Sequence, residues 1–190
     1  MRQYIYQFFS TAWRFPTLYS STTSLRLTVF CLILIQAPFA DCRTALTMKN
    51  YQTIGEASLR VALFRIYDAR LSSPSGMLEP DREPLLLTLK YNRSISREKL
   101  VEETRDQLMG KIGTTNLSKV SAYLEKIWPD VNKGDVISFL LTPNGNGTFY
   151  FNGEPLGAVP DPEFNRAFIN IWLGQNSSYP KLASKLRGES

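Results

Sequence analysis

The chain has 190 residues, enough for one domain with a substantial core and too few for two ordinary domains. Its 43% hydrophobic and 21% charged residues exclude wholesale disorder. The net charge of +5 includes three arginines in an N-terminal leader, and the rest shows no basic stripe with interleaved aromatics, so we expect no nucleic-acid partner. The absence of histidine excludes Ser-His-Asp and Cys-His catalysis and histidine-rich metal sites, and we expect neither a metal nor a cofactor.

The first 40 residues have the pattern of a targeting segment. Arg14 and Arg26 precede an apolar run, residues 27–35, and small residues follow before Asp41. This order is typical of a secretory signal, and the run is shorter than the roughly 20 residues that a membrane-spanning helix needs. We therefore predict a signal peptide or N-terminal anchor over residues 1–40 and an exported domain over residues 41–190, in the periplasm or cell envelope. Cleavage is favoured over retention as an anchor, which would bring membrane association, and over a buried core helix.

Three strands are predicted next, over residues 54–60, 61–71 and 85–91, with a turn and polar loop before the third. Alternation along the second strand predicts that Arg65 shares a face with Tyr67, opposite Asp68. Two helices follow. Ser96 is the expected N-cap of the first, which should end at Gly113, and the second should open at residue 116 or 118 and close before residue 129.

The remaining elements are strands over residues 136–142, 148–151 and 154–158, a helix and a short last helix. Asn152-Gly153 is a hairpin signal, and Asp161-Pro162 is a favourable helix start that precedes a stop at Gly174. A last helix is expected near Pro180. The order of strands, helices, strands and helices predicts an α+β fold in which helices pack on an antiparallel sheet.

Five stretches in this order resemble the chalcone isomerase-like family, in its bacterial exported branch. They are IGEASL at 54–59, FRIYDARL at 64–71, LTLKYNRSIS at 87–96, FYFNGEPLG at 149–157, and DPEF at 161–164 leading to IWL at 171–173. The resemblance implies a curved antiparallel sheet backed by helices, with a cleft between them. Plant members cyclise chalcones to flavanones, and others of that fold bind fatty acids.

The plant enzymes use an arginine and a threonine in the first two strands. The resemblance places Ala62 at the threonine position and Gly55 near the arginine position, with Arg60 close by. One strand position matters because it decides the face on which a side chain lies. The pair that defines the isomerase is therefore not found. The resemblance thus supports the fold, and the missing pair weakens an enzymatic role.

Four residues are the candidate ligand-binding group: Arg65, Tyr67, Tyr91 and Arg93. If the second and third strands are neighbours, two guanidinium and two phenol groups could converge on one anionic headgroup above an apolar trough. The structural alternatives are tyrosines of the core with bonded hydroxyls, and arginines that are solvated or paired with Asp68 or Glu98. No catalytic residue is assigned.

The favoured function is non-catalytic binding of a fatty acid or similar small amphipathic ligand. One alternative is an intramolecular lyase or isomerase acting on a chalcone-like phenolic enone, because such chemistry needs little beyond holding and orienting an anion. Another is an envelope interaction module without a small ligand, which would show an exposed apolar patch in place of a cavity.

Overall fold

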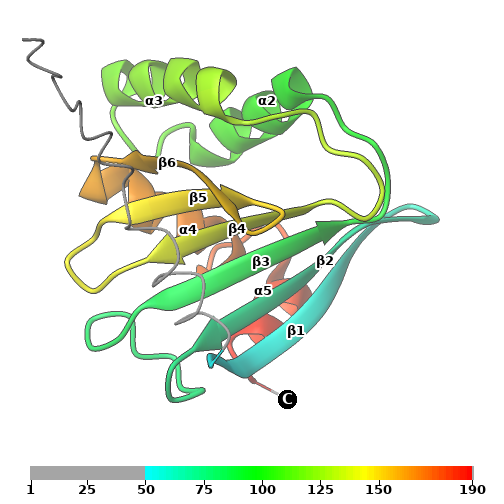
Figure 1. Ribbon diagram of the computed structural model, residues 1–190, viewed down its shortest axis with the longest axis vertical. Helices are drawn as coiled ribbons and strands as arrows, with labels where there is room; N and C mark the ends of the chain where they lie inside the picture. Colours follow the sequence, from blue (N-terminus) through cyan, green and yellow to red (C-terminus); the bar gives the residue numbers. More distant parts are fainter. Residues whose placement is uncertain (1–49, 190) are drawn as a thin grey trace, which may run out of the picture. The chain divides into compact units, whose positions relative to one another are not determined.

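The computed structural model describes residues 50–189, so the predicted targeting segment lies outside the described residues. Six strands form one antiparallel sheet, and each strand pairs with its neighbours in the sequence (Figure 1). They are β1 (Gln52–Val61), β2 (Phe64–Ser73), β3 (Leu85–Tyr91), β4 (Val136–Leu141), β5 (Gly147–Phe151) and β6 (Glu154–Val159). The sheet is open, with β1 and β6 at its edges.

Four helices of the described chain complete the fold. They are α2 (Arg97–Leu108), α3 (Thr114–Ile127), α4 (Pro162–Leu173) and α5 (Pro180–Leu186). Helices α4 and α5 lie behind the sheet in the view of Figure 1, where α4 contacts β4 and α5 contacts β1 and β2. Helix α2 packs on α4, and α3 packs on α2 and reaches β6. The predicted α+β fold, an antiparallel sheet packed against helices, is confirmed.

The predicted helix starts at Ser96 and Asp161 are confirmed by capping hydrogen bonds, whereas α3 begins at Thr114, earlier than the predicted residue 116 or 118. The hydroxyl of Ser96 accepts from the Lys99 N–H at 3.3 Å, and the Asp161 carboxylate accepts from the Phe164 N–H at 3.0 Å. The predicted end of α2 is wrong. The helix ends at Leu108, because Met109 has a non-helical ψ of 126° and Gly110 then adopts a positive φ of 75°.

The sequence pattern did not predict the turn between β1 and β2. The strands are joined by a tight turn at Ala62 and Leu63, in which Ala62 has a φ of 52°. Such turns favour Gly, Asn or Asp because those residues tolerate positive φ at little cost. Because residues 61–64 include none of these three residue types, the pattern of residues 54–71 predicted two adjoining strands and no turn.

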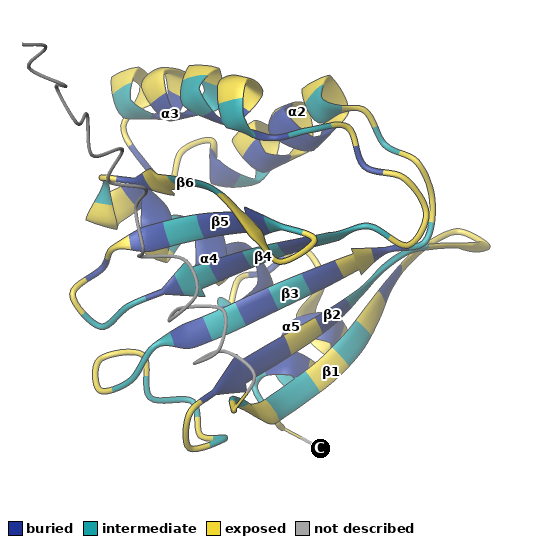
Figure 2. Cartoon of the chain, in the orientation of Figure 1, coloured by how far each residue is buried: buried dark blue, intermediate teal, exposed yellow. Residues whose placement is uncertain are grey.

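The core lies on one face of the sheet, the face covered by helices (Figure 2). Alternate residues of β3, β4 and β5 supply it, and Leu87, Phe139 and Phe149 are almost completely buried. The rings of Phe139, Phe149 and Phe168 lie within 5.0 Å of one another, centroid to centroid, so α4 is packed solidly against β4 and β5.

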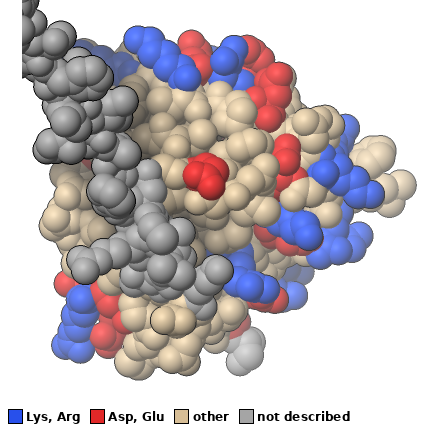
Figure 3. All heavy atoms as spheres, viewed as in Figure 1, with Lys and Arg blue, Asp and Glu red and all other residues tan. Residues whose placement is uncertain are grey.

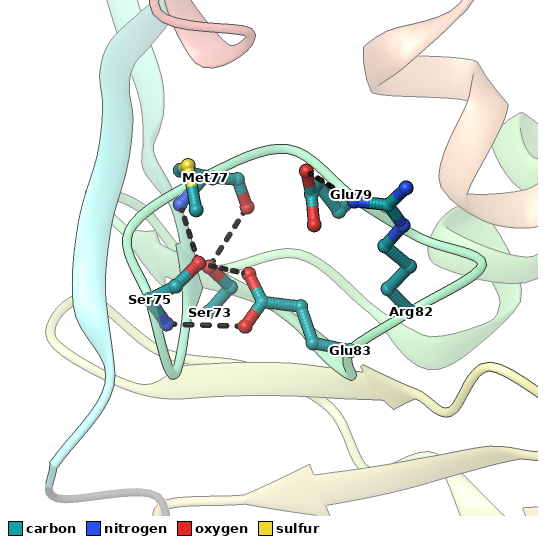
Figure 4. A network of polar contacts seen from close by, with 6 residues as sticks. All are labelled: Ser73, Ser75, Met77, Glu79, Arg82 and Glu83. Carbon is teal, nitrogen blue, oxygen red and sulfur yellow. Dashed lines mark hydrogen bonds and ion pairs between the residues drawn. The ribbon is translucent and has the colours of Figure 1, made fainter.

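The loop between β2 and β3 is ordered by its own polar groups (Figure 4). The Glu83 carboxylate accepts from the backbone N–H of Ser75 at 3.1 Å, and the hydroxyl of Ser75 accepts from the Met77 N–H at 3.1 Å. The hydroxyl of the buried Ser73 donates to the Met77 carbonyl at 2.8 Å. These hydrogen bonds hold the loop at the end of the sheet where β2 finishes and β3 begins.

No helix in the described part of the chain is both long and apolar enough to cross a membrane.

Asn165 of α4 joins the helix to the β4–β5 loop and to the end of β6. Its buried Nδ2 donates to the carbonyl oxygens of Gly145, at 3.0 Å, and Val159, at 2.8 Å.

Asn165→Ala should lower the free energy of unfolding by about 2 to 4 kcal/mol, because two buried carbonyls lose their donor. Urea unfolding of the full chain measures the change. The exposed Asn170→Ala on the same helix is the control, expected within about 0.5 kcal/mol of the parent. Equal effects of the two substitutions would contradict this role.

Candidate functional site

A cavity of about 480 Å³ lies between the helix-covered face of the sheet and the helices. Strands β1 to β4 form one wall, and α2, α4 and α5 form the other. Most of its surface is apolar, with Leu59, Leu89 and Ile137 on the sheet side and Leu100 and Ile171 on the helix side. A volume of this size is within the usual range for a small-molecule site. The arrangement could accommodate a hydrocarbon or aromatic ligand of modest length.

The cavity opens to solvent at one end. Six of its lining residues are exposed: Val61, Arg93, Ser94, Lys99, Glu103 and Tyr179. Lys99 is occupied with acids, because its Nζ lies 2.9 Å from Glu102 and 3.0 Å from Glu103. Within residues 50–189, no carboxylate pairs with Arg93, whose guanidinium lies over the ring of Phe64 at 5.4 Å. Arg93 is therefore the cation at this mouth that is best placed to meet an anionic group.

Tyr67 and Tyr91 are opposite each other in the β2–β3 register, and both line the cavity. Their rings meet edge to face with centroids 6.0 Å apart. The Tyr67 hydroxyl accepts a hydrogen bond of 2.9 Å from the indole Nε1 of Trp172, which leaves its own proton free to donate. The Tyr91 hydroxyl has no hydrogen-bond partner among the described residues. Two phenol protons are thus available to a ligand in the cavity.

Both phenols stay neutral in the folded protein. Burial raises the pKa of Tyr67 well above its usual value of 10, against the opposing effect of the Trp172 hydrogen bond. Burial also raises the pKa of Tyr91, and the neighbouring Tyr67 adds to the effect. At physiological pH each group is therefore a hydrogen-bond donor, suited to a carboxylate or a carbonyl oxygen.

Arg65 does not join this group, and the prediction that it shares the face of Tyr67 is wrong. The β1–β2 register passes from Leu59 opposite Tyr67 to Arg60 opposite Arg65, which leaves Ile66 as an extra residue on β2. This β-bulge shifts the alternation by one position. The Nε of Arg65 donates to the Asp68 carboxylate at 2.6 Å, on the face of the sheet away from the helices.

The pairing of Arg65 is part of a polar network on that second face. The Asp68 carboxylate also accepts from the Ser58 hydroxyl at 2.6 Å and from the Asn92 side chain at 3.0 Å. Burial would raise the pKa of Asp68, but the hydrogen bonds that it accepts outweigh burial and hold its pKa below the usual range. The ion pair expected as the structural alternative for Arg65 is therefore the one observed.

The ligand-binding roles of Tyr67, Tyr91 and Arg93 stay predictions, but the structure brings all three to one cavity. Sequence reasoning missed the polar side chains of α2 at the mouth and Tyr179 between α4 and α5. The helical periodicity assigned α2 only a buried stripe. Tyr179 follows the stop signal at Gly174, where no regular pattern places a side chain.

Neither Gly55 nor Ala62, which the resemblance places near the positions of the plant pair, lines the cavity. Gly55 packs against α5, and a Cβ there would lie 2.1 Å from the Lys185 carbonyl oxygen, so no larger residue fits. Ala62 is in the β1–β2 turn. Among the described residues no group of His, Cys, Asp and Glu side chains is arranged to hold a metal ion.

Sheet, helices and cavity together define an α+β protein with a compartment between its layers. A family model described as chalcone isomerase-like matches residues 68–188, and the chain belongs to this family. An uncharacterised protein of Haemophilus influenzae is 29% identical over 158 residues, which cover 81% of this chain and 72% of that protein. The crystal structure of an Arabidopsis thaliana fatty-acid binding protein has a similar fold, with a TM-score of 0.57 and 10% identity over 73% of this chain and 87% of that one.

The raised pKa of Tyr91 predicts a loss of stability in alkali. Above pH 10 an unfolded tyrosine ionises while the folded one stays neutral, so the unfolded state binds fewer protons. The contribution that the neutral Tyr91 makes to the free energy of unfolding is complete below pH 10. It is lost as pH rises from there through the pKa of the folded state. The free energy of unfolding should fall by about 1.4 kcal/mol per pH unit for this residue in that window.

Tyr91→Phe removes the ionisable group and keeps the ring. Urea unfolding of the full chain between pH 8 and pH 11 should give a shallower decline for Tyr91→Phe than for the parent protein, starting near the usual tyrosine pKa of 10. Parallel curves for the two proteins would show that Tyr91 titrates in the same range in both states.

Proposed function

We propose that the protein is a non-catalytic binder of a fatty acid or similar small amphipathic monocarboxylate, held in the cavity between sheet and helices. One observation carries this proposal: an apolar cavity ends at Arg93, a cation without an acidic partner in the described chain. The hydrocarbon part of the ligand would replace water against the apolar walls, which is favourable in proportion to the area removed from water.

The polar groups suit a carboxylate headgroup. Arg93 supplies a fixed charge with several donors, and the neutral phenols of Tyr67 and Tyr91 supply uncharged ones. Lys99 contributes less because two glutamates compete for it. The Arabidopsis protein of similar fold is a fatty-acid binding protein, which supports the same ligand class here.

We place this function in the cell envelope. The support is the leader over residues 1–40, with its arginines, its apolar run and the small residues that follow it. Expression of the full chain in a bacterial host, followed by fractionation and mass measurement of the product, tests this placement. A product of full mass in the cytoplasm would overturn it.

The first test uses the protein as purified. Organic extraction and mass spectrometry should recover a fatty acid in stoichiometric amount, and dodecanoate should displace a fluorescent probe such as 1-anilinonaphthalene-8-sulfonate from the cavity. The absence of both a recovered amphipath and displacement by dodecanoate would contradict the proposal. Turnover of a chalcone under the same conditions would favour the isomerase instead.

The second test concerns Arg93. Arg93→Gln should weaken dodecanoate binding about tenfold, because a charge-assisted hydrogen bond is lost. It should leave dodecanol, which has the same chain and no charge, within about twofold of the parent. The control is Arg97→Gln, a nearby arginine that pairs with Glu98 and lies outside the cavity. Equal weakening of both ligands, or an equal effect of Arg97→Gln, would show that Arg93 does not hold the carboxylate.

A further inference from the structure

The tip of the β1–β2 hairpin exposes an unbroken apolar run. Val61, Leu63 and Phe64 are 49%, 93% and 63% exposed, with Ala62 between them (Figure 2). Turns at the ends of hairpins are normally polar, and a run of three or four exposed apolar residues is unfavourable in water unless it has a partner. Ala62 also holds a positive φ of 52°, a strained conformation for a residue with a Cβ. Hydration and backbone geometry are both unfavourable here, so folding alone does not explain this sequence.

The apolar tip is bordered by arginines. Arg60 and Arg65 are directly opposite each other in the β1–β2 register, an arrangement that destabilises a sheet by charge repulsion. Of these two, only Arg65 has a carboxylate partner within residues 50–189, and that partner is Asp68. Arg93 lies over the ring of Phe64 from the neighbouring segment. Figure 3 shows blue Lys and Arg atoms beside the projection at the edge of the molecule where this hairpin ends.

The tip is next to the cavity mouth. Val61 and Arg93 belong to both, because they line the opening of the cavity as well as the tip. Tyr179, 39% exposed, stands at the same opening. An aromatic ring with a hydroxyl, aliphatic side chains and arginines is the combination that occurs at the boundary between lipid headgroups and acyl chains.

We propose that the tip, residues 60–65 together with Arg93, docks the protein on an anionic lipid bilayer. Leu63 and Phe64 would enter the boundary between headgroups and acyl chains, and the arginines would meet the lipid phosphates. The cavity mouth would then face the lipid surface. Exchange of a fatty acid between cavity and bilayer follows only if the proposed function holds, whereas docking itself does not depend on it.

Leu63 is the residue to probe because it is the most exposed and lies outside the cavity lining. In the full chain with Cys31→Ser and Cys42→Ser, Leu63→Cys is labelled with nitrobenzoxadiazole. Its emission should shift to the blue with vesicles of phosphatidylcholine and phosphatidylglycerol, and much less with phosphatidylcholine alone. The same label at Met77, in the loop at the opposite end of the sheet, should not respond.

Co-sedimentation with the same vesicles measures the contributions of the side chains. Leu63→Ser should lower the partition coefficient about tenfold, from the lost burial of a leucine. Arg60→Gln should lower it about fivefold, and high salt should reduce that difference. The matched controls at the far end are Met77→Ser and the exposed Arg82→Gln, each expected within about twofold of the parent protein. Residues 1–49 are the same in every variant, so their contribution cancels.

A label at residue 63 that stays in water with anionic vesicles would overturn the proposal. So would an equal response at residue 77, or equal effects of tip and control variants, since the tip would then serve another partner or none. Dodecanoate displacement without vesicles separates this result from the proposed function. Leu63→Ser should bind dodecanoate like the parent, and loss of vesicle binding with intact dodecanoate binding would support docking through the tip.

Discussion

The fold depends on the burial of a single face of an open six-stranded sheet. All four described helices pack on this face, on its edge or on one another. Where α4 meets β4 and β5, three phenylalanine rings pack against one another. Over β1 to β3 the wall is formed by smaller side chains and two tyrosines, and α2 and α5 do not fill the volume in front of it. The cavity is thus a consequence of uneven packing along one apolar layer.

The architecture could be predicted well because the layers follow from local patterns. Period-two alternation identified the strands, and Ser96 and Asp161 marked helix starts that the structure confirms. Each strand pairs with its neighbours in the sequence, even where α2 and α3 intervene between β3 and β4. What the patterns could not show was the turn at Ala62, because no residue there is chemically typical of a turn.

The candidate site was predicted only in part, for a physical reason that lies in β2. The alternation rule assumes an uninterrupted strand, and the bulge at Ile66 breaks it between Arg65 and Tyr67. Arg65 therefore pairs with Asp68 on the other face, while Tyr67 keeps its place opposite Tyr91. A bulge depends on how two strands pair, so it leaves little trace in the sequence of either one. The residues of α2 and of the segment around Tyr179 reach the cavity only through tertiary packing, so their own sequence pattern does not reveal this position either.

Arg93 connects the two proposals. Its guanidinium lies over the exposed ring of Phe64 and also at the cavity mouth, so it can face lipid phosphates or a ligand carboxylate. Without a partnering carboxylate in the described chain, its charge is available to either anion. If the tip docks as proposed, the phosphates would compete with the carboxylate for the same donors and weaken the hold on the ligand. In water that competition would be absent and the carboxylate would stay held. One unpaired cation at the boundary of tip and cavity would thus favour retention away from the bilayer and release at its surface.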